Sequence, residues 1–360
     1  MKKKRILIAP LDWGLGHAAR CVPIINELIA HNAEVVIAAN NRPADLLKKE
    51  FPQLEHLKYP GYTIEYPVNA NMAWTMFRQL PLLFKGIGQE HTMMESIVKS
   101  HGIDAVISDN RWGAYSEQVP SIFMTHQIRI LLSKFLVWGQ GIVDAAQHRF
   151  LKPFSEIWIP DVETGTTLSG ILSHNTAVPD NAYYIGPLSR LKKITRFNKE
   201  LDVLVILSGP EPQRTVFESM IVDQLKESTM RALVVRGTPE RALKMKLSDT
   251  LTLVSALTSD ELSEAIASSH IIISRPGYST IMDLSFLGAN AIFVPTPQQT
   301  EQEYLANRLK AEKICYSEPQ SGFSLQRAVG QFNAYTGFPQ LLNDHTLLQQ
   351  RIDHLLKNIS

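Results

Sequence analysis

Residues 274 to 307 are the stretch that most narrowly constrains how this chain folds. The run Ile271–Ile273 just before it is short, apolar and β-branched, which predicts a buried parallel strand. Pro276 and Gly277 suit a tight turn, because proline fixes one backbone angle and glycine tolerates angles that other residues avoid. A helix is expected as far as a left-handed cap at Gly288, after which a second apolar segment resumes the sheet. The stretch therefore predicts one β-α-β unit of a parallel α/β fold.

Polar groups in this unit fall where such folds bind phosphates and sugars. The first helical turn, at Gly277, Ser279 and Thr280, offers backbone N–H groups that have no partner inside the helix and carry a partial positive charge. Such a helix start can hold a diphosphate without a lysine. Asp283 follows one turn later, where a carboxylate can accept both hydroxyls of a ribose.

A polar loop follows the second strand of the unit. Ligands of open α/β sheets bind beyond the carboxyl ends of the strands, so hydrogen-bonding side chains there suit a sugar. The loop supplies Gln298, Gln299, Thr300, Glu301 and Gln302. A glycine-containing turn alone is common in proteins, but the turn, the acid and the loop together favour a nucleotide-sugar site over an ordinary structural turn.

The segment resembles the donor-binding signature of GT-B glycosyltransferases, especially family 28, which includes the peptidoglycan lipid-intermediate UDP-N-acetylglucosamine transferase and its relatives. The resemblance implies a GT-B fold of two Rossmann-like, doubly wound parallel-sheet domains that face a central cleft. It also implies phosphate contacts by Ser279 and Thr280, a ribose contact by Asp283, and sugar contacts by Glu301 and Gln302. The family usually has Glu at the ribose position, whereas this chain has the shorter Asp.

A glycine-rich turn near the amino terminus has two interpretations. It follows a predicted strand at residues 5–9 and precedes an amphipathic helix at 18–31. Gly14, Gly16 and Ala19 fit the G-x-G-x-x-G/A pattern, which would indicate an NAD-dependent oxidoreductase. The second predicted strand, however, ends in asparagines and lacks the acid that binds an adenosine ribose.

Glycosyl transfer instead gives His17, within the same turn, a chemical role. An acceptor hydroxyl must lose its proton as it attacks the anomeric carbon, and histidine is the usual general base. The resemblance places Gly14 and Gly16 on the acceptor side. The alternative is that His17 only packs or caps locally.

Two further polar residues follow predicted strands, and their positions suggest the same side of the sheet. Asp109 and His126 come directly after strands that end near residues 108 and 124. Asp109 could orient His17 or replace it as the base, and His126 could bind the acceptor.

A third element of the resemblance is the loop at residues 208–214, after the apolar strand 201–207. Family members usually have a glycine-richer loop against the nucleotide phosphates, whereas this loop has one glycine and two prolines. Phosphate contacts are expected from Ser208 and Gly209, whose N–H groups remain available. Arg214 either adds positive charge to the site or is a solvated arginine of a first helical turn.

Length and periodicity predict two domains. The chain has 360 residues, more than a single core usually organises. We expect an acceptor-side domain at 1–190 and a donor-binding domain at 191–341, with a final helix within 342–360 that packs back on the first domain, as in GT-B folds. Parallel strands are expected near Ile6, Val36, Val106, Ile122, Ile157, Tyr184, Val205, Leu233, Leu253, Ile272, Ile292 and Cys315.

Composition narrows the class of protein. The 36 basic residues balance 35 acidic residues, so no electrostatic footprint for nucleic acid is expected. Cys21 and Cys315 predict reduced packing residues of a cytoplasmic protein. The sequence has neither a closely spaced set of Cys and His residues nor an Asp-x-Asp motif. We therefore expect no metal and no other cofactor.

Membrane contact is a further possibility. No apolar run approaches the roughly 20 residues that span a bilayer. Residues 72–94, however, combine Met and aromatic side chains with Arg78 and Lys85, as interfacial helices do. The alternative is ordinary core packing, with the helix broken at Pro81.

The sequence thus favours an inverting, metal-independent glycosyltransferase that uses a nucleotide-sugar donor, expected to be a UDP-sugar, and a hydroxyl acceptor of unknown identity. The resemblance implies cell-envelope chemistry, in the cytoplasm or at the inner face of the plasma membrane. A nucleotide-sugar hydrolase or epimerase of the same fold is the first alternative. An NAD-dependent oxidoreductase and a non-catalytic nucleotide-sugar-binding protein are alternatives from other classes.

Overall fold

The computed structural model describes residues 3–61, 72–194, 198–239, 243–339 and 345–359, without the side chains of 72–78, 80, 134 and 135. The chain divides into two compact units. Unit 1 comprises Met1–Leu188 with Asn343–Ser360, and unit 2 comprises Ser189–Leu342.

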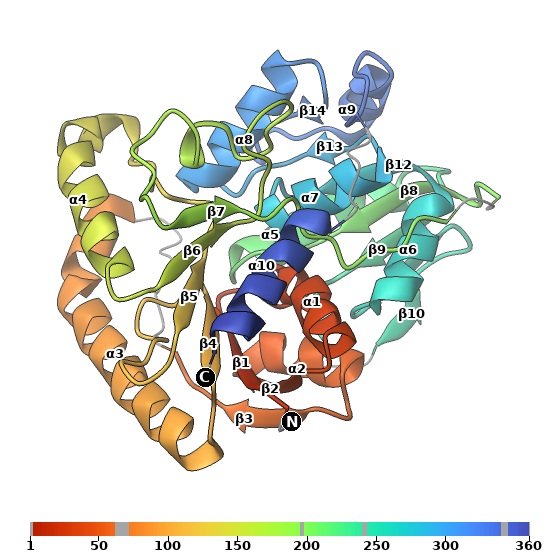
Figure 1. The fold of residues 1–360 in the computed structure, drawn as a ribbon. Helices are drawn as coiled ribbons and strands as arrows, with labels where there is room; N and C mark the ends of the chain where they lie inside the picture. Colours follow the sequence, from red (N-terminus) through yellow and green to blue (C-terminus); the bar gives the residue numbers. More distant parts are fainter. Residues whose placement is uncertain (1–2, 62–71, 195–197, 240–242, 340–344, 360) are drawn as a thin grey trace. The chain divides into compact units, whose positions relative to one another are not determined.

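Unit 1 is built on a seven-stranded sheet in the order β3-β2-β1-β4-β5-β6-β7, with every neighbouring pair parallel (Figure 1). Helices follow most of the strands. In chain order the elements are β1 (Arg5–Pro10), α1 (Leu15–Ala30), β2 (Glu34–Ala39), α2 (Asn41–Glu50), β3 (Glu55–Lys58), α3 (Met72–His101), β4 (Ala105–Asp109), β5 (Ser121–Met124), the 3₁₀ helix η1 (Lys134–Gly139), α4 (Gln140–Leu151), β6 (Glu156–Ile159), the 3₁₀ helix η2 (Gly170–Leu172), β7 (Ala182–Tyr184) and α10 (Thr346–Asn358).

The central strands of unit 1 are buried on both faces. The β1 segment Ile6–Ala9 and the β4 segment Ala105–Asp109 are buried along their whole lengths. Strands covered by helices on both faces read as continuous apolar runs, which is why the sequence predicted them. The prediction of parallel α/β sheets is therefore confirmed.

Helix α10 belongs to unit 1, although it comes from the far end of the chain, and it lies beside α1 (Figure 1). Leu348, Ile352 and Leu355 form its buried face. His31 Nε2 at the end of α1 lies 3.2 Å from Asp353 Oδ1 of α10. This helix therefore contributes an apolar face and a polar anchor to unit 1.

Unit 2 carries a second seven-stranded sheet in the order β10-β11-β9-β8-β12-β13-β14, in which only the β10–β11 pair is antiparallel. Its elements in chain order are β8 (Leu201–Ile206), α5 (Gln213–Lys226), β9 (Ala232–Val235), β10 (Lys244–Lys246), β11 (Leu251–Val254), α6 (Ser259–Ala267), β12 (Ser269–Ser274), α7 (Tyr278–Leu287), β13 (Ile292–Phe293), α8 (Thr300–Ala311), β14 (Tyr316–Ser317) and α9 (Leu325–Phe332). Gly288 ends α7 in the left-handed conformation, φ 63° and ψ 35°, as predicted.

Three details differ from the sequence-based expectations. Strands β3 and β10 were missed, because both are short and polar and show no apolar pattern. Helix α1 begins at Leu15, three residues earlier than expected. Helix α3 runs through Pro81, so the predicted break is wrong. Proline removes one hydrogen bond, a small part of those available to a helix of 30 residues.

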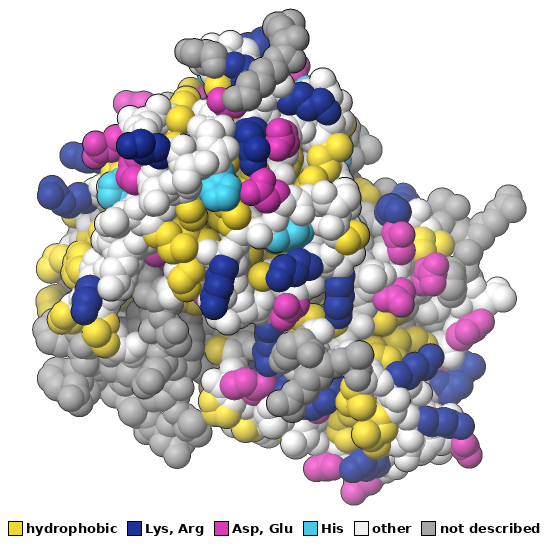
Figure 2. Space-filling model, turned by 90° about the horizontal axis from the view of Figure 1, so that it is seen from below, with side chains coloured by type: hydrophobic (Ala, Val, Ile, Leu, Met, Phe, Trp, Pro, Cys, Tyr) yellow, Lys and Arg dark blue, Asp and Glu magenta, His cyan; other side chains and the backbone are white. Residues whose placement is uncertain are grey.

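The surface mixes charges of both signs. On the face shown in Figure 2, Lys and Arg side chains are interspersed with Asp and Glu side chains over the part that the structure describes. Within the described residues, none of the helices has the length and hydropathy needed to cross a bilayer.

Candidate functional site

In unit 1 the candidate residues gather where the strand order changes direction. Strand β1 has β2 on one side and β4 on the other, and Pro10 of β1 pairs with Asp109 of β4. Ligands of open α/β sheets bind beyond the carboxyl ends of the strands at such a switch point. Gly14 is the N-cap of α1, and Gly16 and His17 lie in its first turn. The structure thus brings the predicted glycine turn beside Asp109.

His17 and Asp109 contact each other directly. The imidazole Nδ1 lies 3.1 Å from Asp109 Oδ2. The His17 side chain is 20% exposed, whereas that of Asp109 is fully buried. A buried carboxylate can orient an imidazole, but it cannot itself reach a substrate hydroxyl. The geometry therefore favours Asp109 as the residue that orients His17 over Asp109 as the base.

Arg20 completes the pair, and the sequence interpretation missed it. Its Nε lies 2.9 and 3.0 Å from the two oxygens of Asp109, and its Nη2 also donates to Asp109 Oδ1. The side chain is 2% exposed. Arg20 lies three residues after His17, so both side chains project from one face of α1. That spacing, with Arg20 set in an otherwise apolar stretch of helix, was the one signal available.

The electrostatics of this group favour an ionised Asp109. Burial acts to raise the pKa of Asp109, but the charges of Arg20 and then His17, with their hydrogen bonds, outweigh it and leave the pKa below its usual value. Cys21 Sγ lies 3.8 Å from Asp109 Oδ2. Burial, and then the Asp109 charge, raise the pKa of Cys21 well above its usual value, so this cysteine remains a thiol.

His126 joins the same group from the segment after β5. It is 5% exposed, and its Nδ1 lies 3.0 Å from Arg20 Nη1. The sequence suggested that Asp109 and His126 face the same side of the sheet. The structure brings them together through Arg20. We call His17, Arg20, Cys21, Asp109 and His126 the unit 1 cluster.

In unit 2 the predicted phosphate and ribose positions lie on α7. Gly277 is the N-cap and supplies no capping side chain. Ser279 and Thr280 lie in the first turn and are partly exposed. A helix start carries a partial positive charge and presents its first backbone N–H groups outward, an arrangement that suits an anion.

Asp283, one turn further along α7, is already held by unit 2. Its Oδ1 accepts a hydrogen bond of 2.6 Å from Ser189 Oγ. Asp283 keeps some exposed surface, but desolvation of its carboxyl raises the pKa to about 6. The hydrogen bond from Ser189, the charge of Arg190 and the backbone N–H of Arg190 act to lower the pKa and only partly offset the desolvation. A carboxylate can accept about four hydrogen bonds, so acceptor capacity remains for ribose hydroxyls.

In the loop between β13 and α8, Gln302, which the sequence predicted to contact the sugar, instead bonds to the backbone of the loop itself. Gln302, 5% exposed, accepts a hydrogen bond of 2.8 Å from the backbone N–H of Thr296 through its side-chain oxygen. Glu303, which the sequence interpretation passed over, accepts one of 2.9 Å from the backbone N–H of Gln298. Glu301 lies in the first turn of α8. Gln302 thus shapes the loop, and Glu301 is the more exposed member of the predicted pair.

The loop after β8 approaches the same region. Ser208 and Gly209 are partly exposed, and Gly209 has φ +104°, a conformation that favours glycine. A Cβ placed on Gly209 would lie 3.7 Å from Thr296 Oγ1, so this loop lies against the β13–α8 loop.

Arg214 is neither solvated nor unpaired. Its Nε lies 2.6 Å from Glu211 Oε1, and its Nη1 donates to Glu218 Oε2. The residue is 4% exposed. Two carboxylates therefore already offset its charge, which weakens the expectation that Arg214 adds positive charge for phosphates.

Arg275 is a second arginine that the sequence interpretation overlooked. It is fully buried after β12, with Nη1 at 2.8 and 2.9 Å from the carbonyl oxygens of Val294 and Pro295. Its Nη2 donates to the carbonyl of Gln213 at 3.2 Å and to Gln320 Oε1 at 2.5 Å. Desolvation lowers the pKa of Arg275. This side chain holds the loops after β12 and β13 and the start of α5 in one arrangement.

Several buried oxygens near these loops have no hydrogen-bond partner among the described residues. They are Ser274 Oγ, Thr296 Oγ1 and Gln299 Oε1. Buried polar atoms are nearly always paired in native proteins, by the protein, by water or by a ligand. Their position at the carboxyl ends of β12 and β13 agrees with a polar ligand site there.

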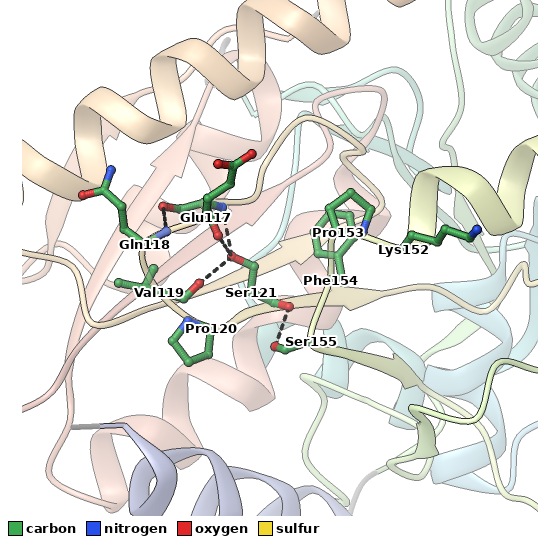
Figure 3. Close-up of a pocket in the computed structure, with 10 residues that line it drawn as sticks. Glu117, Gln118, Val119, Pro120, Ser121, Lys152, Pro153, Phe154 and Ser155 are labelled. Carbon is green, nitrogen blue, oxygen red and sulfur yellow. Dashed lines mark hydrogen bonds between the residues drawn. The ribbon is translucent and has the colours of Figure 1, made fainter.

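The pocket in Figure 3 lies elsewhere. It has a volume of about 450 Å³ and is lined by residues 116–121 and 152–155, around the starts of β5 and β6. The unit 1 cluster lies at the opposite, carboxyl ends of the strands. The pocket contains none of the predicted site residues. Across the described ranges, no group of three Cys, His, Asp or Glu side chains is arranged to hold a metal ion.

Comparisons with known proteins show what the chain is similar to. The glycosyltransferase family 28 C-terminal domain matches residues 220–334, within unit 2. The UDP-N-acetylglucosamine–N-acetylmuramyl-(pentapeptide) pyrophosphoryl-undecaprenol N-acetylglucosamine transferase of Methylobacterium sp. (strain 4-46) is 32% identical over 84 residues, 23% of each chain. The match thus spans less than a quarter of that relative. An uncharacterized glycosyltransferase of Methanosarcina mazei is 22% identical over 331 residues, 85% of this chain and 84% of that protein.

Structural likeness extends over the whole chain. The spinosyn rhamnosyltransferase SpnG, in complex with thymidine diphosphate, has a TM-score of 0.62 and 14% identity, and the match covers 98% of this chain and 96% of that one. This likeness shows a shared fold. The chain thus has the fold of GT-B glycosyltransferases, and its residues 220–334 match the family 28 C-terminal domain.

Proposed function

We propose that this chain is an inverting glycosyltransferase that moves a sugar from a UDP-sugar to a hydroxyl acceptor. The observation that carries the proposal is the 3.1 Å contact between His17 Nδ1 and the buried Asp109 carboxylate, at the switch point of unit 1. A partly exposed imidazole held by a buried carboxylate is suited to general-base chemistry.

The reaction is a single displacement. The acceptor hydroxyl transfers its proton to His17 Nε2, while Asp109 accepts the hydrogen on Nδ1. The hydroxyl oxygen forms a new bond to the anomeric carbon as the bond from that carbon to the diphosphate oxygen breaks. The electron pair of the broken bond leaves with the nucleoside diphosphate, and the proton remains on an imidazolium that Asp109 stabilises. One displacement inverts the anomeric centre.

Unit 2 would hold the donor. The first turn of α7, at Gly277, Ser279 and Thr280, supplies N–H groups for the diphosphate and stabilises it as it departs, without a metal ion. Asp283 accepts the ribose hydroxyls, and Glu301 contacts the sugar. Relatives named for UDP-N-acetylglucosamine, and the thymidine diphosphate bound to SpnG, support a pyrimidine nucleoside diphosphate.

Ligand-dependent thermal unfolding tests the donor. We expect UDP to stabilise the protein, with smaller effects of dTDP and GDP and none of NAD. A nucleotide at about 100 times its dissociation constant adds about 2.7 kcal/mol. EDTA should leave the UDP effect unchanged, because the helix start replaces a metal ion. Stabilisation by NAD alone would contradict the proposal and favour an oxidoreductase.

Turnover of the donor separates transfer from hydrolysis. With a radiolabelled UDP-sugar and lipid or soluble hydroxyl acceptors, we expect label in a glycosylated product and little donor breakdown in their absence. Equal breakdown with and without acceptor would identify a nucleotide-sugar hydrolase. The relatives named for an undecaprenol-linked acceptor support a lipid-linked acceptor at the inner face of the plasma membrane.

Peripheral membrane contact is part of this proposal. Among the described side chains of unit 1, the most exposed large apolar groups lie on α3, η1 and α4. Helices α3 and α4 meet where the rings of Phe84 and Phe150 lie 5.8 Å apart. Exposed Lys85 and Arg149 lie on the same two helices. Apolar groups beside cations suit an anionic membrane surface. The apolar set is Leu82, Phe84, Val137, Trp138 and Ile142, each between 56% and 81% exposed.

A further inference from the structure

One guanidinium contacts three other members of the unit 1 cluster. Arg20 Nε donates to Asp109, Nη1 lies 3.0 Å from His126 Nδ1, and Nη2 lies 3.0 Å from His17 Nδ1. Arg20 is buried, and α1 fixes its distance from His17. No comparable arginine joins two histidines elsewhere in the part of the chain that the structure describes.

The contact with His126 has a single interpretation. Arginine stays protonated in proteins and can only donate hydrogen bonds. His126 Nδ1 must therefore accept, which leaves the ring neutral with its hydrogen on Nε2. In this tautomer His126 can donate a hydrogen bond through Nε2 but cannot take up a proton there, nor can it accept from Gln127 Nε2, which lies 3.5 Å away.

The contact with His17 has two interpretations. His17 Nδ1 lies 3.0 Å from a donor, Arg20 Nη2, and 3.1 Å from an acceptor, Asp109 Oδ2. A hydrogen on Nδ1 bonds to Asp109 and leaves Nε2 free to act as a base. If the hydrogen lies on Nε2 instead, Nδ1 accepts a hydrogen bond from Arg20, and Nε2 can no longer act as a base. An acceptor hydroxyl that donates to Nε2 selects the first form, and an ionised Asp109 supports it.

We propose that Arg20 is a positioning residue that gives the two histidines opposite roles, with His126 as a fixed hydrogen-bond donor to the acceptor substrate and His17 as the base. The role of His17 rests on the proposed function, whereas the tautomer of His126 does not. The titratable and charged groups around Asp109 are His17, Arg20 and Cys21 from α1, and His126 beyond Arg20. Arg111, two residues further on, instead pairs with Glu90.

Nitrogen NMR of the histidine rings tests the assignment without substrate. At pH 7 we expect an unprotonated Nδ1 and a protonated Nε2 for His126 in the intact protein. In Arg20→Met this preference should be lost, and His126 should take up a proton as the pH falls. A protonated Nδ1 on His126 in the unaltered protein would overturn the proposal, whatever the enzyme does.

Kinetics test the division of roles. His126→Gln keeps an N–H near the position of Nε2, so we expect activity within about tenfold of the unaltered enzyme, whereas His17→Gln should lose activity by a hundredfold or more. Arg20→Met should move the acidic limb of the kcat/KM profile upward by about one pH unit, because the cation that favours the charged carboxylate is gone. Equal losses for His126→Gln and His17→Gln would overturn the proposal.

A buried control separates positioning from folding. Arg111→Lys disturbs a fully buried arginine paired with Glu90, so it should lower stability without moving the acidic limb. If Arg20→Met does not fold, Arg20→Lys keeps the charge but not the three-way contact, and His126 should then lose its single tautomer. An Arg20→Lys protein that is less stable but has unchanged ring tautomers and an unchanged pH profile would reduce Arg20 to a structural residue.

Discussion

The two units share a strand order but differ at the carboxyl ends of their sheets. In both units six parallel strands follow one order, β3-β2-β1-β4-β5-β6 in unit 1 and β11-β9-β8-β12-β13-β14 in unit 2. Unit 1 places a buried ionic group, Arg20 and Asp109, beside two histidines. Unit 2 places a helix start without a capping side chain beside Arg275, which is held by carbonyl oxygens.

This difference follows from the chemistry each unit is proposed to serve. Proton transfer needs an ionised carboxylate and an oriented imidazole, and a buried arginine keeps that carboxylate charged. Binding a diphosphate needs aligned N–H groups in a fixed loop. The proposed function thus assigns a reactive site to unit 1 and a binding site to unit 2 on one topology, and substitutions in the two units should affect different quantities.

The largest expected effect is that of Asp109→Asn on turnover. The amide would lose the charge that stabilises the imidazolium and could hold His17 in the wrong tautomer. We expect kcat to fall about 10²- to 10⁴-fold, while the dissociation constant for UDP stays unchanged. Steady-state kinetics and calorimetric titration with UDP measure the two quantities. A matching loss of UDP affinity would contradict the separation of roles.

Arg275→Met should lower the stability of unit 2. The substitution leaves the carbonyls of Val294 and Pro295 and the Gln320 side chain without their donor. An unsatisfied buried acceptor costs about 1–3 kcal/mol, so we expect a loss of about 3 kcal/mol in urea unfolding and weaker UDP binding. Arg308→Met, which removes the partly exposed pair between Arg308 of α8 and Glu312 at the C-cap of that helix, is the control and should cost less than about 1 kcal/mol.

The pH dependence of nucleotide binding tests Asp283. Its pKa of about 6 lies above the unfolded value of about 3.9, so the protonated form stabilises the fold below about pH 4, and this contribution is lost as the pH rises through 6. Ribose hydroxyls favour the carboxylate, so UDP affinity should fall as the pH drops below 6, by at most about tenfold per unit. Calorimetry between pH 5 and about 8 measures this dependence. In Asp283→Asn the dependence should disappear, and its persistence would exclude Asp283 as the ribose contact.

The smallest expected effect is on membrane binding, and it should follow only from substitutions in unit 1. Trp138→Glu with Ile142→Glu should reduce flotation with anionic vesicles about tenfold, because two side chains that are each only partly inserted would together contribute about 1.5 kcal/mol, as much as one fully buried apolar group. Activity on a water-soluble acceptor should not change. Val216→Glu alters an exposed apolar residue of unit 2 and should leave flotation unchanged. Equal flotation of all three proteins would remove membrane contact from the proposal.

Much of the fold could be predicted from local sequence. Buried parallel strands such as β1 and β12 are apolar runs, and the glycine cap of α7 has a fixed backbone requirement. Strands β3 and β10 escaped prediction because they are short and polar. The run of α3 through Pro81 also escaped it, because the rest of a long helix compensates for one lost hydrogen bond.

The candidate site was predicted less completely. His17, Asp109 and His126 could be assigned to one side of a sheet from the strands they follow. Arg20 could not, because its partner Asp109 lies 89 residues away and only the folded sheet brings them together. Arg275 was hidden for a similar reason, because it pairs with backbone carbonyls, which leave no pattern in a sequence.

The most direct test of the account is transfer by His17→Ala compared with the unaltered enzyme, with UDP affinity measured on both proteins. We expect transfer from a UDP-sugar to fall about a hundredfold or more while UDP binds equally well. Unchanged transfer by His17→Ala would contradict the assignment of unit 1 as the reactive unit.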